Sequence, residues 1–171
     1  MKAFLARHKS LKILLNVIVI VLVLLLLKVY GQRGVVEGEA PGIAGQLVDG
    51  QQVELSQYRG APVLVHFWAS WCGICRLEEG GIDAIARDYP VITVAMQSGR
   101  DDEIRGYLQK QGLSFPTLAD PQGEIASEYG IKGVPASFIV DAKGSIRFVE
   151  VGYTTETGLR LRLWLARWLS F

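Results

Sequence analysis

The sequence has few residues of the kinds that bind metal ions. It contains two cysteines, Cys72 and Cys75, and two histidines, of which only His66 lies beyond the first ten residues. A metal site requires more ligands than two thiolates, and the sequence offers no third soft ligand beside them. We therefore predict no metal-binding residues.

A concentration of basic residues is also missing. The 171 residues carry 18 Lys and Arg against 17 Asp and Glu, and the small positive excess comes from the N-terminal end. From residue 46 onward, acidic residues slightly outnumber basic ones. Without a basic stripe, nucleic acid is not expected as a partner. Internal repeats and low-complexity stretches are absent as well, and the length fits one domain of ordinary size plus an appendage.

One long apolar run lies near the N-terminus. Residues 11–30 read LKILLNVIVIVLVLLLLKVY, about the twenty residues that a helix needs to cross the hydrocarbon core of a bilayer. Four basic residues and no acidic residue lie before the run or at its start, so the positive-inside rule places the N-terminus in the cytoplasm. No clean A-x-A cleavage site follows the run, which favours an uncleaved anchor over a removed signal peptide.

These features divide the chain into four expected parts. Residues 1–10 are predicted to form a cytoplasmic tail and residues 11–30 a single transmembrane helix. Residues 31–45 are rich in glycine and lack periodicity, so we expect a flexible linker there. Residues 46–171 are expected to form one exported domain, which the span attaches to the cytoplasmic membrane.

The exported part alternates between strand and helix patterns. Two continuous apolar runs, at 61–68 and 91–96, are typical of strands buried on both faces. A helical pattern between Cys72 and Tyr89 joins them, so the two strands are expected to be parallel. Two helices and an antiparallel hairpin are expected after them, at 101–112, 124–133 and 136–151. The sequence therefore predicts an α/β domain with a central mixed sheet flanked by helices.

The C-terminal residues fit two patterns. The stretch LRLRLWL alternates as a strand would, but more positions match a helix that is buried on one side. The apolar positions at helical spacing are Leu161, Trp164, Leu165, Trp168 and Leu169. We expect a helix that packs this face on the core and leaves a solvated basic edge.

Four interpretations compete for the two cysteines in WASWCGICRLEEG, residues 68–80. A structural disulfide suits an exported domain, but two intervening residues close a loop too small to constrain the unfolded chain much. A metal site needs more ligands than the pair supplies. Covalent haem attachment needs a histidine directly after the second cysteine, where this sequence has Arg76. The fourth interpretation is thiol–disulfide exchange.

Thiol–disulfide exchange has a physical basis at this place in the chain. The motif lies between a predicted buried strand and a predicted helix, so Cys72 would stand at the helix N-terminus. Unsatisfied backbone N–H groups and the positive end of the helix dipole stabilise a thiolate there. Cys75, one turn further on, would resolve the mixed disulfide. We favour this interpretation of the pair.

The sequence resembles thioredoxin-like proteins over residues 46–169. FWASWCGIC resembles the thioredoxin active-site stretch, and GVPASFIVDAKGSI the segment with the family's cis-proline and following hairpin. Over the longer stretches LVDGQQVELSQYRGAPVLVHFWASWC and PTLADPQGEIASEYGIKGVPASFIVDAKG, followed by VGY, the chain resembles the membrane-tethered TlpA/DsbE branch. That branch includes the suppressor-of-copper-sensitivity protein disulfide oxidoreductases. The resemblance implies a thioredoxin-like fold and a periplasmic or external domain at the bacterial inner membrane.

The resemblance also implies roles for individual residues. Cys72 would attack the substrate and Cys75 would resolve the intermediate, with Trp71 flanking the reactive sulfur. Pro135 would follow a cis peptide bond and face the pair, and the backbone of Val134 would pair with an extended substrate segment. Because proline has no backbone N–H, no hydrogen-bond donor of this residue would crowd the thiol. The alternative for these two residues is an ordinary turn before a strand.

Two further residues are candidates for tuning the thiols. His66 stands where thioredoxins place a buried aspartate; it would either face Cys75 and move protons or be a half-buried histidine bound to backbone. Glu78 stands three residues after Cys75, where some relatives carry an acid that is thought to tune the thiols. It would otherwise be a solvated helix residue.

The sequence thus predicts an enzyme, a protein disulfide oxidoreductase that uses the disulfide itself and no organic cofactor. Its substrates would be thiols and disulfides of exported proteins, and resemblance favours the reducing direction with a transmembrane thiol reductant as electron donor. Two alternatives stay open. One is a copper- or other metal-binding thiol module, and the other is a thiol peroxidase. Peroxidases usually have a hydroxyl residue three positions before the reactive cysteine, where this chain has Ala69.

Overall fold

The computed structural model describes residues 15–23 and 34–168, and the chain divides into two units between Arg33 and Gly34. In the first unit, residues 15–23 form a helix with exposed side chains. Within the described ranges, no helix is long and apolar enough to cross a membrane. The expected cytoplasmic tail at 1–10 and both ends of the expected span at 11–30 lie outside the described residues, so the span stays a prediction.

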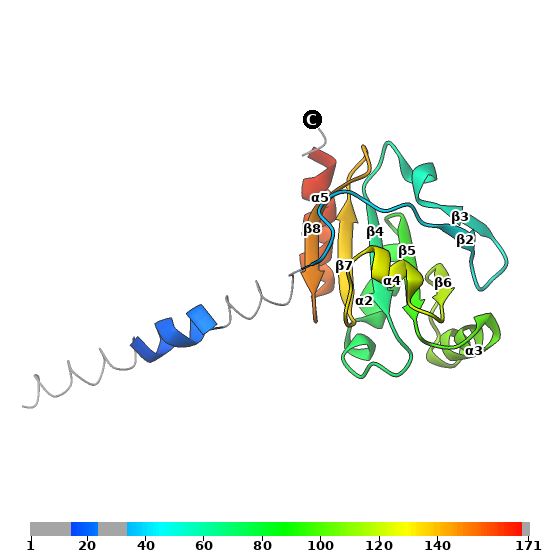
Figure 1. Cartoon of the computed structure of the whole chain (residues 1–171), viewed down its shortest axis with the longest axis horizontal. Helices are drawn as coiled ribbons and strands as arrows, with labels where there is room; N and C mark the ends of the chain where they lie inside the picture. The colour runs from blue at the N-terminus through cyan, green and yellow to red at the C-terminus, as the bar shows by residue number, and fades with distance from the viewer. Residues whose placement is uncertain (1–14, 24–33, 169–171) are drawn as a thin grey trace, which may run out of the picture. The chain divides into compact units, whose positions relative to one another are not determined.

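The second unit is built on a six-stranded sheet in the order β1-β8-β7-β4-β5-β6 (Figure 1). Its strands are β1 (Gly38–Glu39), β4 (Val63–Trp68), β5 (Val91–Met96), β6 (Thr117–Asp120), β7 (Ala136–Val140) and β8 (Ser145–Val151). β4, β5 and β6 pair in parallel, whereas β1–β8, β8–β7 and β7–β4 are antiparallel. A separate antiparallel hairpin consists of β2 (Ala44–Gln46) and β3 (Gln52–Glu54). The predicted mixed sheet is confirmed.

β4 lies in the middle of the sheet because its sequence is apolar toward both faces. All six of its residues are buried. Side chains alternate between faces along a strand, so Leu64 and Trp68 join one core while Val65 and Phe67 join the other. The sheet therefore positions whatever follows the C-terminal end of β4 between two packed layers.

Helices cover both faces of the sheet. The first core packs under α2 (Glu79–Ala86), α3 (Asp101–Gln111) and α5 (Glu156–Trp168). The second core packs under α4 (Glu124–Glu128) and the N-terminal part of the domain, including the 3-10 helix η1 (Leu55–Tyr58). The predicted helices at 101–112 and 124–133 and the hairpin at 136–151 are confirmed, with the second helix shorter than expected.

The expected flexible linker at 31–45 is wrong for its described part, which belongs to the folded domain. β1 pairs with β8, and the Val36 N–H donates to the Tyr129 carbonyl oxygen at 3.3 Å. Ile43 is almost fully buried in the second core. Figure 1 shows this segment crossing one face of the sheet from the β8 side toward β2 and β3. A two-residue strand leaves no periodic pattern in a sequence, and this is why composition suggested a linker.

α5 is confirmed as a helix, but the predicted buried face is wrong. Leu159, Leu163 and Ala166 are buried instead, whereas Leu161, Trp164 and Trp168 are exposed. α5 lies very close to α2 because Gly81 has no side chain: a Cβ there would lie 3.1 Å from the Cβ of Glu156. Leucine and alanine fit such a close contact between helices, and two tryptophans do not.

Candidate active site

The two cysteines lie beyond the C-terminal end of β4. They form a disulfide with a Cα–Cα distance of 5.3 Å. Cys72 retains 6% of its surface exposed and Cys75 none, so only Cys72 is accessible to another molecule. This difference in access agrees with the order of attack that the sequence suggested.

The predicted continuous helix from Cys72 is wrong in its first part. A short 3-10 helix, η2 (Cys75–Leu77), comes first, and α2 begins only at Glu79. Cys72 therefore stands before a short 3-10 turn and not at the N-terminus of an α-helix. One backbone donor still points at its sulfur, since the Cys75 N–H lies 3.1 Å from Cys72 Sγ. In the reduced protein, a hydrogen bond from this amide would favour the Cys72 thiolate, which is the effect that was expected of a helix N-terminus.

The loop before β7 faces the cysteines from the other side. The Val134–Pro135 peptide bond is cis, as the resemblance implied. The Val134 carbonyl oxygen lies 3.6 Å from Cys72 Sγ. Val134 is half-buried and Pro135 buried. The structure thus brings together four of the predicted site residues, two from the loop after β4 and two from the loop before β7.

Several apolar side chains in and near the cysteine loop are exposed. Trp71 is 58% exposed, and its indole Nε1–H donates to the Gln97 carbonyl oxygen at 3.0 Å. Ile74, Leu77 and Tyr153 are also more than half exposed. Exposed apolar side chains that gather on a surface are typical of a place where another molecule binds. Trp71 is held in position by its hydrogen bond, and this suits a residue that flanks the reactive sulfur.

His66 and Glu78 meet in the interior behind the cysteines. His66 Nε2 lies 3.7 Å from Glu78 Oε1, and both side chains are buried. His66 Nδ1 lies 2.9 Å from Ser137 Oγ, and Glu78 Oε2 accepts the Thr154 N–H at 2.9 Å. Within the described residues, Glu78 Oε1 has no hydrogen-bond partner. His66 is therefore neither half-buried nor bound to backbone, and Glu78 is not a solvated helix residue.

Burial governs the charge of this pair. It lowers the pKa of His66 to about 3 and raises the pKa of Glu78 to about 7, in the latter case against the hydrogen bond from Thr154. Removal from water disfavours the charged form of both groups. At slightly acidic pH the pair is therefore a neutral imidazole beside a protonated carboxyl, and not an ion pair.

Ser137, Thr154 and Gln97 could not be recognised as site residues from the sequence. Ser137 lies opposite His66 in the β4–β7 register, so it becomes visible only once strand pairing is known. Thr154 directly follows the VGY stretch that contributed to the resemblance. Gln97 has a positive φ of 49° just after β5, which sequence patterns do not reveal.

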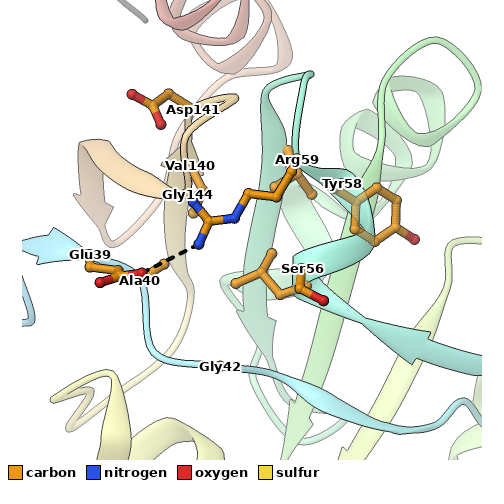
Figure 2. Close-up of a pocket in the computed structure, with 11 residues that line it drawn as sticks. Glu39, Ala40, Gly42, Ser56, Tyr58, Arg59, Val140, Asp141 and Gly144 are labelled. Carbon is orange, nitrogen blue, oxygen red and sulfur yellow. Dashed lines mark hydrogen bonds and ion pairs between the residues drawn. The ribbon is translucent and has the colours of Figure 1, made fainter.

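A hollow lies at the end of the sheet opposite the cysteines. It has a volume of about 170 Å³ and lies beside the start of β4 and the end of β7 (Figure 2). Across it, the Arg59 guanidinium contacts the Glu39 carboxylate at 3.3 Å. The Arg59 side chain lies over Gly144, where a Cβ would clash with it. We interpret this hollow as part of the attachment of the N-terminal segment to the domain.

Metal ligation receives no support from this arrangement. Among residues 15–23 and 34–168, no three His, Cys, Asp or Glu side chains are grouped so as to hold a metal ion. The cysteines are joined to each other, and His66 contacts Ser137 and Glu78.

Comparison with known proteins places the chain among thioredoxin-like proteins. The sequence profile of the AhpC/TSA family matches residues 36–149. A thioredoxin-like protein of Haemophilus influenzae is 33% identical over 141 residues, which cover 81% of this chain and 84% of that protein. The thiol-disulfide oxidoreductase ResA of Bacillus thuringiensis is 29% identical over 112 residues, 63% of this chain and 65% of its own length.

A solved structure gives the same result for the fold. A Chlorobium tepidum protein assigned as the thiol:disulfide interchange protein DsbE superposes with a TM-score of 0.68 at 28% identity. The match covers 77% of this chain and 98% of that one. The expected thioredoxin-like fold is confirmed for the domain.

Proposed function

The chain belongs to the AhpC/TSA family of thioredoxin-like proteins, and we propose that it is a membrane-anchored enzyme that exchanges disulfides with exported proteins. Its activity class is that of the DsbE/ResA-type thiol–disulfide oxidoreductases, given the fold, the relatives and the disulfide-forming cysteine pair. The membrane anchor, the substrates and the direction of electron flow are the proposed part.

One observation carries the proposal. The accessible sulfur of the Cys72–Cys75 disulfide lies 3.6 Å from the Val134 carbonyl oxygen, in a loop that exposes the apolar side chains of Trp71 and Ile74. An extended substrate segment that pairs with the Val134 backbone would place its own sulfur beside Cys72. The side chain of Trp71 would then cover one flank of the reacting atoms.

The reaction is two successive thiol–disulfide exchanges. In the reducing direction, the Cys72 thiolate attacks a substrate disulfide, forms a mixed disulfide and expels one substrate thiolate, which takes up a proton. Cys75 then loses its proton, attacks Cys72 Sγ and expels the second substrate thiolate. The substrate gains two electrons and two protons, and the enzyme disulfide re-forms. The oxidising direction is the reverse, and neither requires an organic cofactor.

Family resemblance favours the reducing direction and an electron donor in the membrane. A thiol reductant of the transmembrane type would reduce the Cys72–Cys75 disulfide after each cycle. The apolar run at 11–30, with basic residues before it, supports a single span with the N-terminus in the cytoplasm of a bacterium and the domain in the periplasm or outside.

A thiol peroxidase is the strongest rival. Ala69, three residues before Cys72, is buried and its carbonyl oxygen accepts the Cys72 N–H at 3.0 Å. This position supplies no hydroxyl to bind a peroxide. The proposal therefore predicts disulfide reduction and little turnover of peroxide.

The full chain tests the proposal directly. Wild-type protein should reduce insulin disulfides when supplied with dithiothreitol, and Cys72→Ala should not. In cells, Cys75→Ala should accumulate mixed disulfides with exported proteins, because the resolving thiol is missing. The double variant Cys72→Ala/Cys75→Ala is the matched control and should trap none. Peroxide consumption or stoichiometric metal binding without insulin reduction would contradict the proposal.

A further inference from the structure

The turn that follows β5 contacts the cysteine loop at two points. The Ser70 N–H donates to Ser98 Oγ at 3.0 Å, and the Trp71 indole Nε1–H donates to the Gln97 carbonyl oxygen at 3.0 Å. Ser70 and Trp71 are the two residues directly before Cys72. Two hydrogen bonds therefore connect the chain beside the reactive sulfur to a turn that lies far away in the sequence.

The order of the strands brings this turn to the site. β4 and β5 are parallel neighbours, and Trp68 pairs with Ala95 near their C-terminal ends (Figure 1). Chain segments that follow two parallel strands leave the sheet at the same edge, where open α/β sheets place their sites. Ser70 lies just beyond Trp68, and Ser98 lies just beyond Ala95. Their contact thus follows from the pairing of the two strands.

The turn is itself bonded to the ends of the strands. The Gln97 N–H donates to the Asp120 carbonyl oxygen of β6 at 2.8 Å, and the Ser98 hydroxyl donates to the Met96 carbonyl oxygen at 3.0 Å. A hydroxyl donates one hydrogen bond and can accept others, so Ser98 binds both Met96 and Ser70. Ser98 is only 9% exposed. The cysteine loop is therefore attached to the sheet through buried or backbone groups.

Gln97 has a backbone conformation that few residues adopt. Its φ is 49°, in the left-handed region. Residues other than glycine are uncommon there, because the Cβ approaches the neighbouring backbone. Strained residues of this kind persist where the surroundings fix them, and they gather at functional sites. At Gln97, the left-handed conformation accompanies a carbonyl group that accepts the Trp71 indole.

The two hydrogen bonds matter most when the disulfide is open. In the oxidised protein, the bond to Cys75 also fixes Cys72. Reduction removes this covalent constraint, and the contacts from Gln97 and Ser98 are then the hydrogen bonds from outside the loop that hold the residues before Cys72. Its sulfur lies 3.6 Å from the Val134 carbonyl oxygen, and a misplacement of about 1 Å is enough to slow a reaction severely.

From these observations we propose that Gln97 and Ser98 are positioning residues, which keep Cys72 and Trp71 in place for a protein substrate while the disulfide is open. This inference rests on the proposed function. Both residues act through Ser70 and Trp71 and take no part in the transfer of electrons. Their effect should therefore be confined to substrates that are long enough to pair with the Val134 backbone and lie against Trp71.

Single-turnover kinetics of the full chain test this role. The protein is reduced, freed of dithiothreitol and mixed with insulin or with bis(2-hydroxyethyl) disulfide, and the loss of the Cys72 thiol is followed by alkylation and mass spectrometry. Ser98→Ala removes the acceptor of the Ser70 N–H. It should slow the reaction with insulin about fivefold, the factor that corresponds to one hydrogen bond. The reaction with the small disulfide, which has no backbone to pair with Val134, should keep its wild-type rate.

A pair of substitutions at Gln97 tests the direction of its carbonyl group. Valine is strongly disfavoured in the left-handed conformation, whereas asparagine is among the residues that adopt it. Gln97→Val should therefore slow the reaction with insulin as Ser98→Ala does, and Gln97→Asn should not. Ser127→Ala, at an exposed serine of α4, is the matched control and should react as the wild type does. Thermal unfolding identifies any variant that does not fold, and Ser98→Ala carries the test if Gln97→Val is one.

The two substrates separate positioning from other roles. Wild-type rates with insulin in folded Ser98→Ala and Gln97→Val would overturn the inference. Equal slowing with insulin and with the small disulfide would also overturn it, because the two residues would then affect only the fold or the reactivity of the thiol. A wild-type chain that does not reduce insulin would contradict the proposed function itself, whereas an active wild type with unaffected variants would contradict only the positioning.

Discussion

Replacing Glu78 by glutamine is expected to stabilise the oxidised protein at alkaline pH. Burial raises the pKa of Glu78 from an ordinary 4.5 to about 7. Each pKa unit corresponds to about 1.4 kcal/mol, so the folded protein is destabilised by about 3 kcal/mol when Glu78 ionises. An acid whose pKa is higher in the folded than in the unfolded protein adds its full share to the unfolding free energy at pH values below the unfolded pKa. That contribution is lost as pH rises from 4.5 through 7.

His66 behaves in the opposite way. Burial lowers its pKa from 6.5 to about 3, so its contribution is fully present above pH 6.5 and is lost as pH falls toward 3. Between pH 4.5 and 6.5, the contributions of Glu78 and His66 to the pH dependence of the unfolding free energy cancel. On folding, an ionised glutamate and a protonated histidine become a neutral pair, with no net uptake or release of protons by these two groups.

The assay is urea unfolding of the oxidised wild type and Glu78→Gln at pH 5 and pH 8. Glutamine can still accept the Thr154 N–H, so the variant removes the charge and keeps the hydrogen bond. We expect the gain in unfolding free energy to be larger at pH 8 than at pH 5 by about 2–3 kcal/mol. The mirror variant, His66→Gln, should gain stability toward acidic pH instead.

A charged His66–Glu78 ion pair would give the reverse result. Glu78→Gln would then leave a buried imidazolium without its partner, at a cost of about 3–5 kcal/mol. A Glu78→Gln variant that is less stable than the wild type at neutral pH, or one whose gain is the same at pH 5 and pH 8, would refute the neutral pair.

In the reduced protein, Cys72 should be alkylated faster than Cys75 at neutral pH. We expect its pKa to lie below the ordinary value of about 8.5, because the Cys75 N–H points at its sulfur. Iodoacetamide labelling followed by mass spectrometry measures the two rates, and faster labelling of Cys75 would contradict the prediction. At a pH where the introduced carboxyl is ionised, His66→Asp should make the pair more reducing by ~30 mV, since a carboxylate in place of a neutral imidazole would destabilise a thiolate by about 1.4 kcal/mol. Glutathione equilibrium at one pH measures the shift, and either no shift or a change toward oxidising values would contradict this role of His66. A reporter that is active only outside the cytoplasm, fused after Phe171, should be active in the membrane fraction; a soluble shortened product would indicate a cleaved signal instead.

Strong local patterns made most of the sheet predictable. The runs VLVHFW and VITVAM are too apolar for any position other than the centre of a sheet, and they became β4 and β5. The glycine that ends α3, Gly112, adopts the left-handed conformation expected of a helix C-cap. These features depend on neighbouring residues alone, so a single sequence suffices to predict them.

The errors arose where the outcome depended on distant contacts. Two apolar stripes compete on α5, and the one without tryptophan is buried where the helix packs against the core and α2. The pairing of His66 with Glu78 depends on how η2 and α2 pack behind β4, which spacing along the chain does not specify. The expected proton-moving role of His66 stays a prediction, but its isolation from water and its partners are now defined.

The chain from Gly34 to Leu47, most of which was mistaken for a linker, supplies one edge strand of the six-stranded sheet and covers the other edge. At one end, β1 pairs with the outer side of β8; at the other, Leu47 forms an antiparallel bridge with Leu118 of the opposite edge strand, β6. Uncovered edge strands present unpaired N–H and C=O groups on which a second chain can assemble. A shortened protein that starts at residue 46 would bare the β8 edge and remove Ile43 from the core, and aggregation through that edge is the expected consequence. A soluble form of the domain should therefore begin at Gly34.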